Sequence, residues 1–254
     1  KMKPIVLYVI TLFNFTILQA QCDGRYQEEI FDSVSVTTVT YSNINDLQLD
    51  IYQTEDDLKL DRPLILLAHG GAFIAGTRTN ATMVSLAKTF AKRGYVVASI
   101  SYRLMSFPEL LSNPIEGVVK ALSDGKAAVR YFRKTVAEGN TYRIDPDQIY
   151  FGGNSAGAVI ALHAVFMQEE DVTNPNLLDV LNNNGGIEGN SGNEGYSSDV
   201  RGAISLAGGI IDVNFMSESD FDKFLITCHG GEDNIVPYNC EQPFSGFASQ
   251  LEAS

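Results

Sequence analysis

One serine lies in a segment that is typical of a catalytic nucleophile. Ser155 is the centre of Gly153-Asn-Ser-Ala-Gly157, which has the pattern Gly-x-Ser-x-Gly. An apolar, β-favouring run at 149–151 precedes it, and an apolar stretch at 156–167, typical of a buried helix, follows it. The two glycines permit a tight turn from strand to helix, because neither carries a side chain that would obstruct it. The sequence therefore predicts a strained turn that presents the Ser155 hydroxyl at the N-terminus of a helix.

The alternative is a glycine-rich loop that contains a serine by chance. The flanking strand and helix are the context that confirms this motif, so they favour the nucleophile. The segment Gly152-Gly-Asn-Ser-Ala-Gly157 also resembles the nucleophile elbow of α/β-hydrolases of the carboxylesterase and hormone-sensitive-lipase-like kind, a resemblance that extends from about Val34 to the end of the chain. It implies a serine hydrolase that cleaves carboxylic esters through an acyl-enzyme on Ser155, with no metal ion and no organic cofactor.

A second motif, His69-Gly-Gly-Ala-Phe73, follows a continuous apolar run and resembles the His-Gly-Gly-Gly oxyanion loop of the same family. Glycines let the backbone approach an oxygen closely enough for its N–H groups to point at it. By the resemblance, the N–H groups of Gly71, Ala72 and Ala156 form the oxyanion hole. Ala72 replaces a third glycine, which leaves the N–H unchanged and narrows the pocket. An ordinary glycine turn is the alternative.

A further segment, Ser101-Tyr-Arg-Leu104, is similar to the family's Tyr-Arg-Leu strand end. We interpret Arg103 as a structural residue beneath the oxyanion loop.

The third chemical motif, His229-Gly-Gly-Glu-Asp-Asn-Ile-Val-Pro-Tyr238, resembles the loop that supplies the acid of the catalytic triad in this family. Asp233 occupies the position of the acid, whose role is to orient the triad histidine. Asp212, which follows an expected strand ending near Leu206, is the alternative acid. Glu232 is less well placed than Asp233.

None of the three histidines of the chain is expected to be the triad base. The order in this fold is nucleophile, acid, histidine, whereas His69 precedes the serine and His229 precedes Asp233. His163 lies eight residues beyond Ser155 on the expected helix, which puts it about 12 Å away along the axis. We therefore expect a C-terminally truncated chain that lacks the last strand and helix, has its triad histidine beyond residue 254, and is inactive alone.

Alternating strand and helix patterns position these motifs. We expect strands at 33–41, 47–52, 63–68, 95–102, 148–151, 201–206 and 224–227, and helices at 79–93, 114–137 and 156–167. The first two strands should pair as a hairpin. The remaining alternation predicts the α/β-hydrolase fold, a mostly parallel twisted sheet with helices on both faces. The segment at 168–200, rich in Asn and Gly, lacks periodicity and predicts a lid-like or disordered insertion; a solvated surface excursion is the alternative.

Composition and charge bound the remaining possibilities. The chain has 254 residues, of which 44% are hydrophobic and 19% charged, which fits one globular domain at 21–254. The net charge of −13 argues against a nucleic-acid partner and against binding to anionic lipid.

Residues 1–20 have the basic start, apolar run and terminal small residue of a secretory signal peptide, so we expect a secreted or periplasmic protein with no stable membrane insertion after cleavage. A membrane anchor and a lipidated Cys22 are the alternatives.

The three cysteines leave one unpaired. A bridge between Cys228 and Cys240 would clamp the loop that carries Asp233, and two free thiols are the alternative.

The expected partner is a small-molecule or polysaccharide-linked ester substrate. A non-catalytic binding protein and a serine peptidase of the same fold are the alternative functions.

Overall fold

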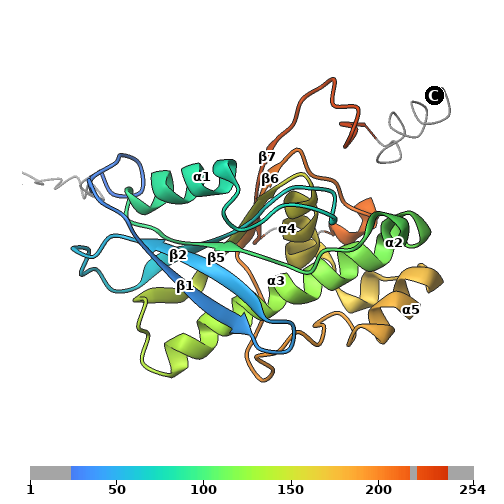
Figure 1. Cartoon of the computed structure of the whole chain (residues 1–254), viewed down its shortest axis with the longest axis horizontal. Coiled ribbons are helices and arrows are strands. Elements are labelled where there is room, and N and C mark those ends of the chain that lie inside the picture. The colour runs from blue at the N-terminus through green and yellow to red at the C-terminus, as the bar shows by residue number, and fades with distance from the viewer. Residues whose placement is uncertain (1–23, 218–221, 240–254) are drawn as a thin grey trace, which may run out of the picture.

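A seven-stranded sheet forms the centre of the protein in the computed structural model, which describes residues 24–217 and 222–239 (Figure 1). The strand order is β1-β2-β4-β3-β5-β6-β7. The strands are β1 (Ser35–Ser42), β2 (Leu47–Gln53), β3 (Arg62–Ala68), β4 (Val96–Ile100), β5 (Ile144–Asn154), β6 (Gly202–Leu206) and β7 (Phe224–Cys228). β1 and β2 form the predicted antiparallel hairpin, and β2 is also antiparallel to β4. All other pairings are parallel, which confirms the predicted fold class.

The register of the parallel strands brings their carboxyl ends level. Ala68 at the end of β3 pairs with Gly153, Asn154 at the end of β5 pairs with Leu206, and Leu206 pairs with Cys228 at the end of β7. The residues that follow these strands therefore meet at one edge of the sheet, where ligands bind in open α/β folds. The three predicted chemical motifs all begin at this edge.

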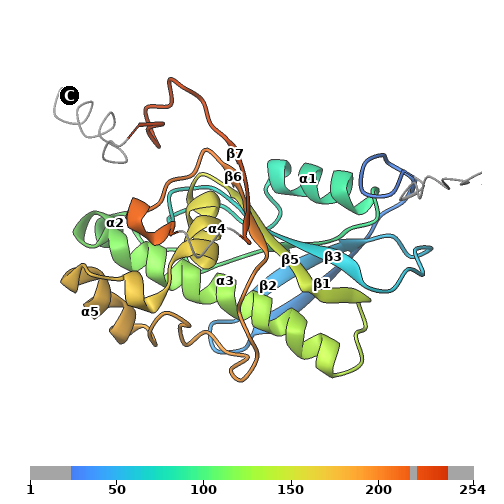
Figure 2. The ribbon, with the colours of Figure 1, turned by 180° about the vertical axis from the view of Figure 1, so that it is seen from behind.

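Helices cover both faces of the sheet (Figures 1 and 2). α1 (Ala81–Ala91) lies on one face, while α3 (Pro114–Ala137) and α4 (Ala156–Phe166) lie on the other. α2 (Phe107–Ser112), α5 (Pro175–Asn183) and the 3₁₀ turns η1 (Glu169–Asp171) and η2 (Val213–Phe215) complete the elements. Alternate residues of β3 point to the two faces, so Leu64 packs in the core under α3 and α4, whereas Ile65 packs in the core under α1.

Two helices were not expected from the sequence. α2 spans only six residues, so the i, i+3, i+4 spacing of Phe107, Leu110 and Leu111 is too short to indicate a helix. The expectation that the segment at 168–200 has no regular structure was wrong, because α5 buries Leu177, Val180 and Leu181. Those residues follow the i, i+3, i+4 spacing of a helix. The helix is only nine residues long and lies in a segment rich in Asn and Gly, so this spacing is hard to recognise in the sequence.

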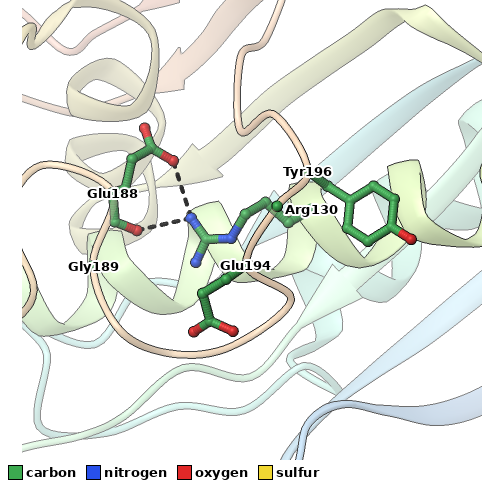
Figure 3. A pocket seen from close by; sticks show the side chains of 6 residues that line it. Arg130, Glu188, Gly189, Glu194 and Tyr196 are labelled. Carbon is green, nitrogen blue, oxygen red and sulfur yellow. Dashed lines mark hydrogen bonds and ion pairs between the residues drawn. The ribbon is translucent and has the colours of Figure 1, made fainter.

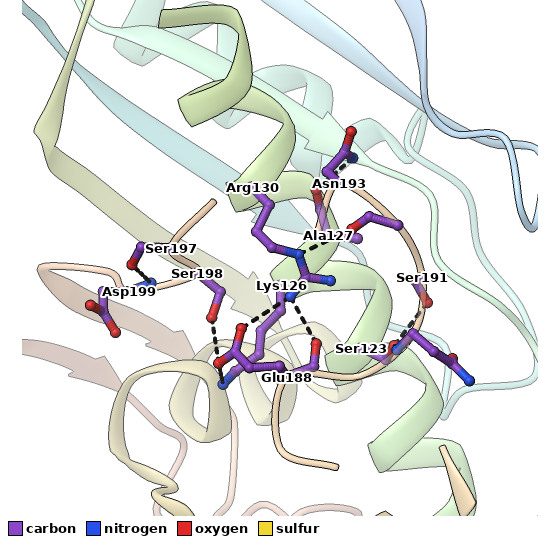
Figure 4. Close-up of polar contacts among 12 residues, drawn as sticks. Ser123, Lys126, Ala127, Arg130, Glu188, Ser191, Asn193, Ser197, Ser198 and Asp199 are labelled. Atoms are coloured by element: carbon purple, nitrogen blue, oxygen red, sulfur yellow. Dashed lines mark hydrogen bonds and ion pairs between the residues drawn. The ribbon is translucent and has the colours of Figure 1, made fainter. Parts of the chain in front are cut away.

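The rest of that segment is fastened to α3 by charged and polar contacts. Arg130 Nη1 donates to the Glu188 carboxylate at 3.1 Å and to the Glu188 carbonyl at 2.8 Å beside a small surface pocket (Figure 3). Lys126 Nζ donates to the same carboxylate at 2.9 Å, and the Arg130 Nε–H donates to the Gly192 carbonyl at 3.0 Å (Figure 4). A role of this segment as a lid stays a prediction.

Several expectations concern residues outside the described ranges. These are the signal peptide at 1–20 and the partner cysteine Cys240 of the predicted bridge. Cys228 is an exposed free thiol in the structure, and the bridge stays a prediction. Within the ranges described, no helix has the length and apolar character needed to cross a membrane.

Candidate active site

Ser155 occupies a strained turn between β5 and α4. Its backbone φ is 52° and its ψ is −120°, a conformation that residues with a side chain rarely adopt. The Ser155 N–H donates to the Leu206 carbonyl at 2.8 Å, and the Ser155 carbonyl accepts from the N–H groups of Ala158 and Val159 at 2.9 and 3.0 Å. These bonds from a neighbouring strand and from the helix hold the turn in the strained conformation.

The two glycines of the motif each solve a separate steric problem. A Cβ atom on Gly153 would lie 2.2 Å from the carbonyl carbon of Gly157, so the strand could not meet its own helix. A Cβ atom on Gly157 would lie 2.0 Å from the Ala68 oxygen, so the helix could not approach the end of β3. The predicted tight turn is therefore present, and its tightness comes from β3 as well as from the turn itself.

The loop after β3 lies against this turn. A Cβ atom on Gly70 would be 3.3 Å from the Ser155 Cβ and 2.9 Å from the Asn154 Oδ1. Gly71, Ala72 and Phe73 all have positive φ, at 124°, 51° and 63°. Among the described residues, no protein acceptor takes the N–H groups of Gly71, Ala72 or Ala156. The predicted oxyanion-hole donors thus belong to two adjoining backbone segments.

Tyr102 supports the loop from behind, a role that the sequence did not reveal. Its hydroxyl donates to the His69 carbonyl at 2.8 Å, and its ring stacks on the His69 ring with the centroids 4.3 Å apart. The next residue, Arg103, donates from Nε to both carboxylate oxygens of the fully buried Asp124 at 3.0 Å. Ser191 also donates to Asp124, at 2.5 Å, so the strand end, α3 and the inserted segment share one buried carboxylate.

Asp233 follows β7 at the same edge of the sheet. Its Oδ1 accepts from the N–H groups of Ile235 and Val236 at 2.9 and 3.0 Å, and these bonds lower the pKa of the carboxyl. Its Oδ2 lies 3.7 Å from His229 Nε2. Asp212, the alternative acid, caps η2 by accepting from the Asn214 N–H at 2.9 Å. Both carboxylates therefore stabilise turns, and two backbone N–H groups bind that of Asp233.

Each of the three histidines has a ring nitrogen engaged away from Ser155. His69 Nδ1 lies 2.8 Å from the Gly70 carbonyl, and His229 Nε2 lies 2.7 Å from the Val236 carbonyl. His163 contacts the Val159 carbonyl and the Ile211 N–H. No hydrogen bond links Ser155 to a histidine within the part of the chain that the structure describes.

No group of three or more His, Cys, Asp or Glu side chains is arranged to hold a metal ion among the described residues.

The sequence model of the BD-FAE family matches residues 49–224, which is more than half of the chain. The chain belongs to the BD-FAE family. A probable isoprenylcysteine alpha-carbonyl methylesterase of Oryza sativa subsp. japonica is 34% identical over 138 residues, which cover 54% of this chain and 30% of that protein. Another, of Arabidopsis thaliana, is 27% identical over 208 residues, which cover 80% of this chain and 38% of that protein. The chain thus spans about a third of the length of these curated relatives.

Solved structures show the same fold. The native form of an esterase from the Planctomycetes species Thermogutta terrifontis superposes with a TM-score of 0.58 at 21% identity and covers 86% of this chain and 76% of that one. The resemblance to α/β-hydrolases of the carboxylesterase kind is thereby confirmed at the level of family and fold.

Proposed function

We propose that the protein is a serine hydrolase that cleaves carboxylic esters through an acyl-enzyme on Ser155. The observation that carries the proposal is the backbone of Ser155, at φ 52° and ψ −120°, at the start of α4 and against the Gly70 loop. Strain of this kind persists only where the surrounding structure maintains it, and it clusters at sites of chemistry. The strand–turn–helix context is also the one that confirms a Gly-x-Ser-x-Gly nucleophile.

The reaction proceeds in two steps. The Ser155 hydroxyl attacks the ester carbonyl, and the developing oxyanion accepts from the N–H groups of Gly71, Ala72 and Ala156. These donors have no protein acceptor among the described residues, so they are free to bind the oxyanion. The triad imidazole takes the Ser155 proton as the oxygen attacks and donates it to the leaving alcohol. Water then attacks the acyl-enzyme and releases the carboxylic acid.

Asp233 acts as the acid of the triad. Two backbone N–H groups bind its Oδ1 and lower the pKa of the carboxyl, so it is ionised at neutral pH. Its Oδ2 accepts no hydrogen bond shorter than the 3.7 Å approach of His229 among the described residues, which leaves that oxygen to orient an imidazole.

A second candidate is a binding protein of the same fold that performs no catalysis. The contacts of the three histidines favour it, because none of them contacts Ser155. A serine hydroxyl without a general base is a weak nucleophile at neutral pH. The esterase function requires a general base for Ser155, and turnover of an ester by the full-length protein separates the two functions.

The substrates we propose are small carboxylic esters, including esters linked to polysaccharide. The curated relatives bear the name of methylesterases, which supports an ester of a small alcohol. The net charge of −13 disfavours strongly anionic substrates. The basic and apolar N-terminal sequence supports action outside the cytoplasm.

The test is hydrolysis of p-nitrophenyl acetate by the full-length protein and labelling by a fluorophosphonate probe. Ser155→Ala should abolish both, because the probe and the ester react with the same oxygen. Ser205→Ala, a buried serine at the end of β6, is the matched control and should keep both. Labelling of a different serine in the Ser155→Ala protein would remove the nucleophile assignment.

A further inference from the structure

A buried histidine on the helix that follows the nucleophile holds the loop after β6. We propose that His163 is a positioning residue, which fixes residues 207–211 between the turn that carries Ser155 and the loop that carries Asp233. The proposal rests on the proposed function, because it concerns how these two groups are aligned.

The hydrogen bonds of His163 define the form of its ring. Nε2 lies 3.1 Å from the Ile211 backbone nitrogen, whose N–H donates to it. Nε2 is therefore an acceptor, so the proton of the neutral ring is on Nδ1 and is donated to the Val159 carbonyl at 2.7 Å. The ring is fully buried, and Phe215 packs edge-on against it with the centroids 6.1 Å apart. Burial lowers the pKa of His163 to about 4, so the neutral form is present at neutral pH.

The beginning of the loop is held by the first turn of the same helix. The Leu206 carbonyl accepts from the Ser155 N–H at 2.8 Å. Gly208 lies so close to α4 that a Cβ atom there would be 2.5 Å from the Ala158 Cβ. The far end of the loop, at Ile211, is held by His163 further along α4. One rigid element thus holds both ends of the loop.

The other side of the loop faces the segment that carries Asp233. The Ala207 N–H donates to the Cys228 carbonyl at 2.8 Å. A Cβ atom on Gly209 would lie 3.6 Å from Val236 Cγ1, an ordinary van der Waals contact. Val236 in turn donates its N–H to Asp233 Oδ1 at 3.0 Å. The loop is therefore a shared support: it contacts α4 on one side, and on the other it bonds to the end of β7 and lies beside Val236, which binds Asp233.

The experiment is a series of substitutions at His163 in the full-length protein. His163→Gln places an amide oxygen near the position of Nε2 and keeps the acceptor for Ile211. His163→Asn reaches only toward Val159, and His163→Leu keeps neither bond. Val165→Ala, at a buried position of the same helix, controls for a general loss of stability. The measurements are the hydrogen-exchange rate of the Ile211 amide, kcat and KM for p-nitrophenyl acetate, and labelling by a fluorophosphonate.

We expect His163→Leu and His163→Asn to lose protection of the Ile211 amide and to lower kcat about tenfold to a hundredfold, since small misplacements of catalytic groups have effects of this order. KM should change less than about twofold, because the substrate contacts remain. His163→Gln should restore both protection and kcat. Val165→Ala should lower stability without a selective change in either. The Asn variant keeps the test valid if the Leu variant fails to fold.

Unchanged exchange at Ile211 in the Leu and Asn variants would overturn the contact. Lost protection with unchanged kcat would overturn the positioning role, as would an equal loss of kcat in the Gln variant. If the full-length wild-type protein hydrolyses no ester, the proposed function fails and the catalytic half of this proposal fails with it. Exchange of the Ile211 amide would still decide whether His163 holds the loop.

Discussion

The turn at Ser155 and the loop at Asp233 lie at the same edge of one sheet, but the structure supports them differently. β5 lies between β3 and β6, and the helix that follows it is buried at nearly every position. β7 is the last strand of the described sheet, and all five of its residues are exposed. The position of Ser155 is determined by close backbone packing among β3, β6 and α4, whereas the position of Asp233 depends on one neighbouring strand and a few loop contacts.

This difference indicates where each half of the site is sensitive to change. Near Ser155, substitutions are limited by steric clashes, because an added side-chain atom would overlap with neighbouring backbone atoms. Near Asp233, substitutions are limited by the loss of polar contacts, because hydrogen bonds to a carboxylate stabilise the turn. Glycine substitutions should therefore damage the first region and leave the second intact, while the removal of charge should damage the second.

The largest effect on stability is expected for Gly157→Ala. Its methyl group would lie 2.0 Å from the Ala68 oxygen, which belongs to a central strand. We expect a loss of about 4 kcal/mol or more in the free energy of unfolding, in the range of severe core clashes. Gly230→Ala, in the Asp233 loop, has no atom within 4 Å of the new methyl group and is the matched control. Thermal unfolding of both variants measures the contrast, and equal stabilities would contradict it.

The second prediction concerns the charge at Asp233. Asp233→Asn should lower kcat by up to about four orders of magnitude, because an amide cannot stabilise the imidazolium that forms during the reaction. Asp212→Asn should not have this effect, since Asp212 caps η2. Steady-state kinetics of the two full-length variants decides between them. A large loss at Asp212 with a small loss at Asp233 would move the acid to the loop after β6.

The two regions also differ in how far the sequence predicts them. Gly153, Ser155 and Gly157 are close in sequence, and a steric rule that concerns one turn relates them. The parallel core strands were predictable for a similar reason, since each is a continuous apolar run. The link from His163 through the loop at 209–211 to Val236 joins residues far apart in the chain by tertiary packing. No periodicity or motif in the sequence marks it. α5 was missed because its three buried apolar residues lie among polar ones that individually favour loops.

The third prediction concerns His163, whose titration reports how tightly the helix that follows Ser155 is packed. The folded protein holds His163 at a pKa of about 4, below the usual value of 6.5, because the ring is buried. Between these two values the unfolded chain binds the proton that the folded protein excludes, so stability falls as the pH falls. Titration of His163 does not change the free energy of unfolding above about pH 6.5, and lowers it by about 3 kcal/mol at pH 4.

Denaturant unfolding of the wild type and of His163→Gln at pH 7 and at pH 4.5 checks this slope. The glutamine variant should lose less stability on acidification, because it has no group to protonate at that position. Parallel pH profiles for the two proteins would show that the ring titrates freely in the folded state and that the helix is less tightly packed around it than the structure indicates.

The smallest effect is expected on the outermost strand. Ile149 on β5 is 1% exposed and Ile226 on β7 is 62% exposed, although both are isoleucines in parallel strands of the same sheet. Ile149→Ala should lower the free energy of unfolding by about 2–5 kcal/mol, the sum of lost burial and the cavity that remains. Ile226→Ala removes a side chain that is already largely in water, so it should cost less than about 1 kcal/mol. Denaturant unfolding of the two variants in the full-length protein measures both losses in the free energy of unfolding. A loss at Ile226 as large as that at Ile149 would show that further protein covers β7 there. The acid side would then be packed as firmly as the nucleophile side, and the contrast between them would disappear.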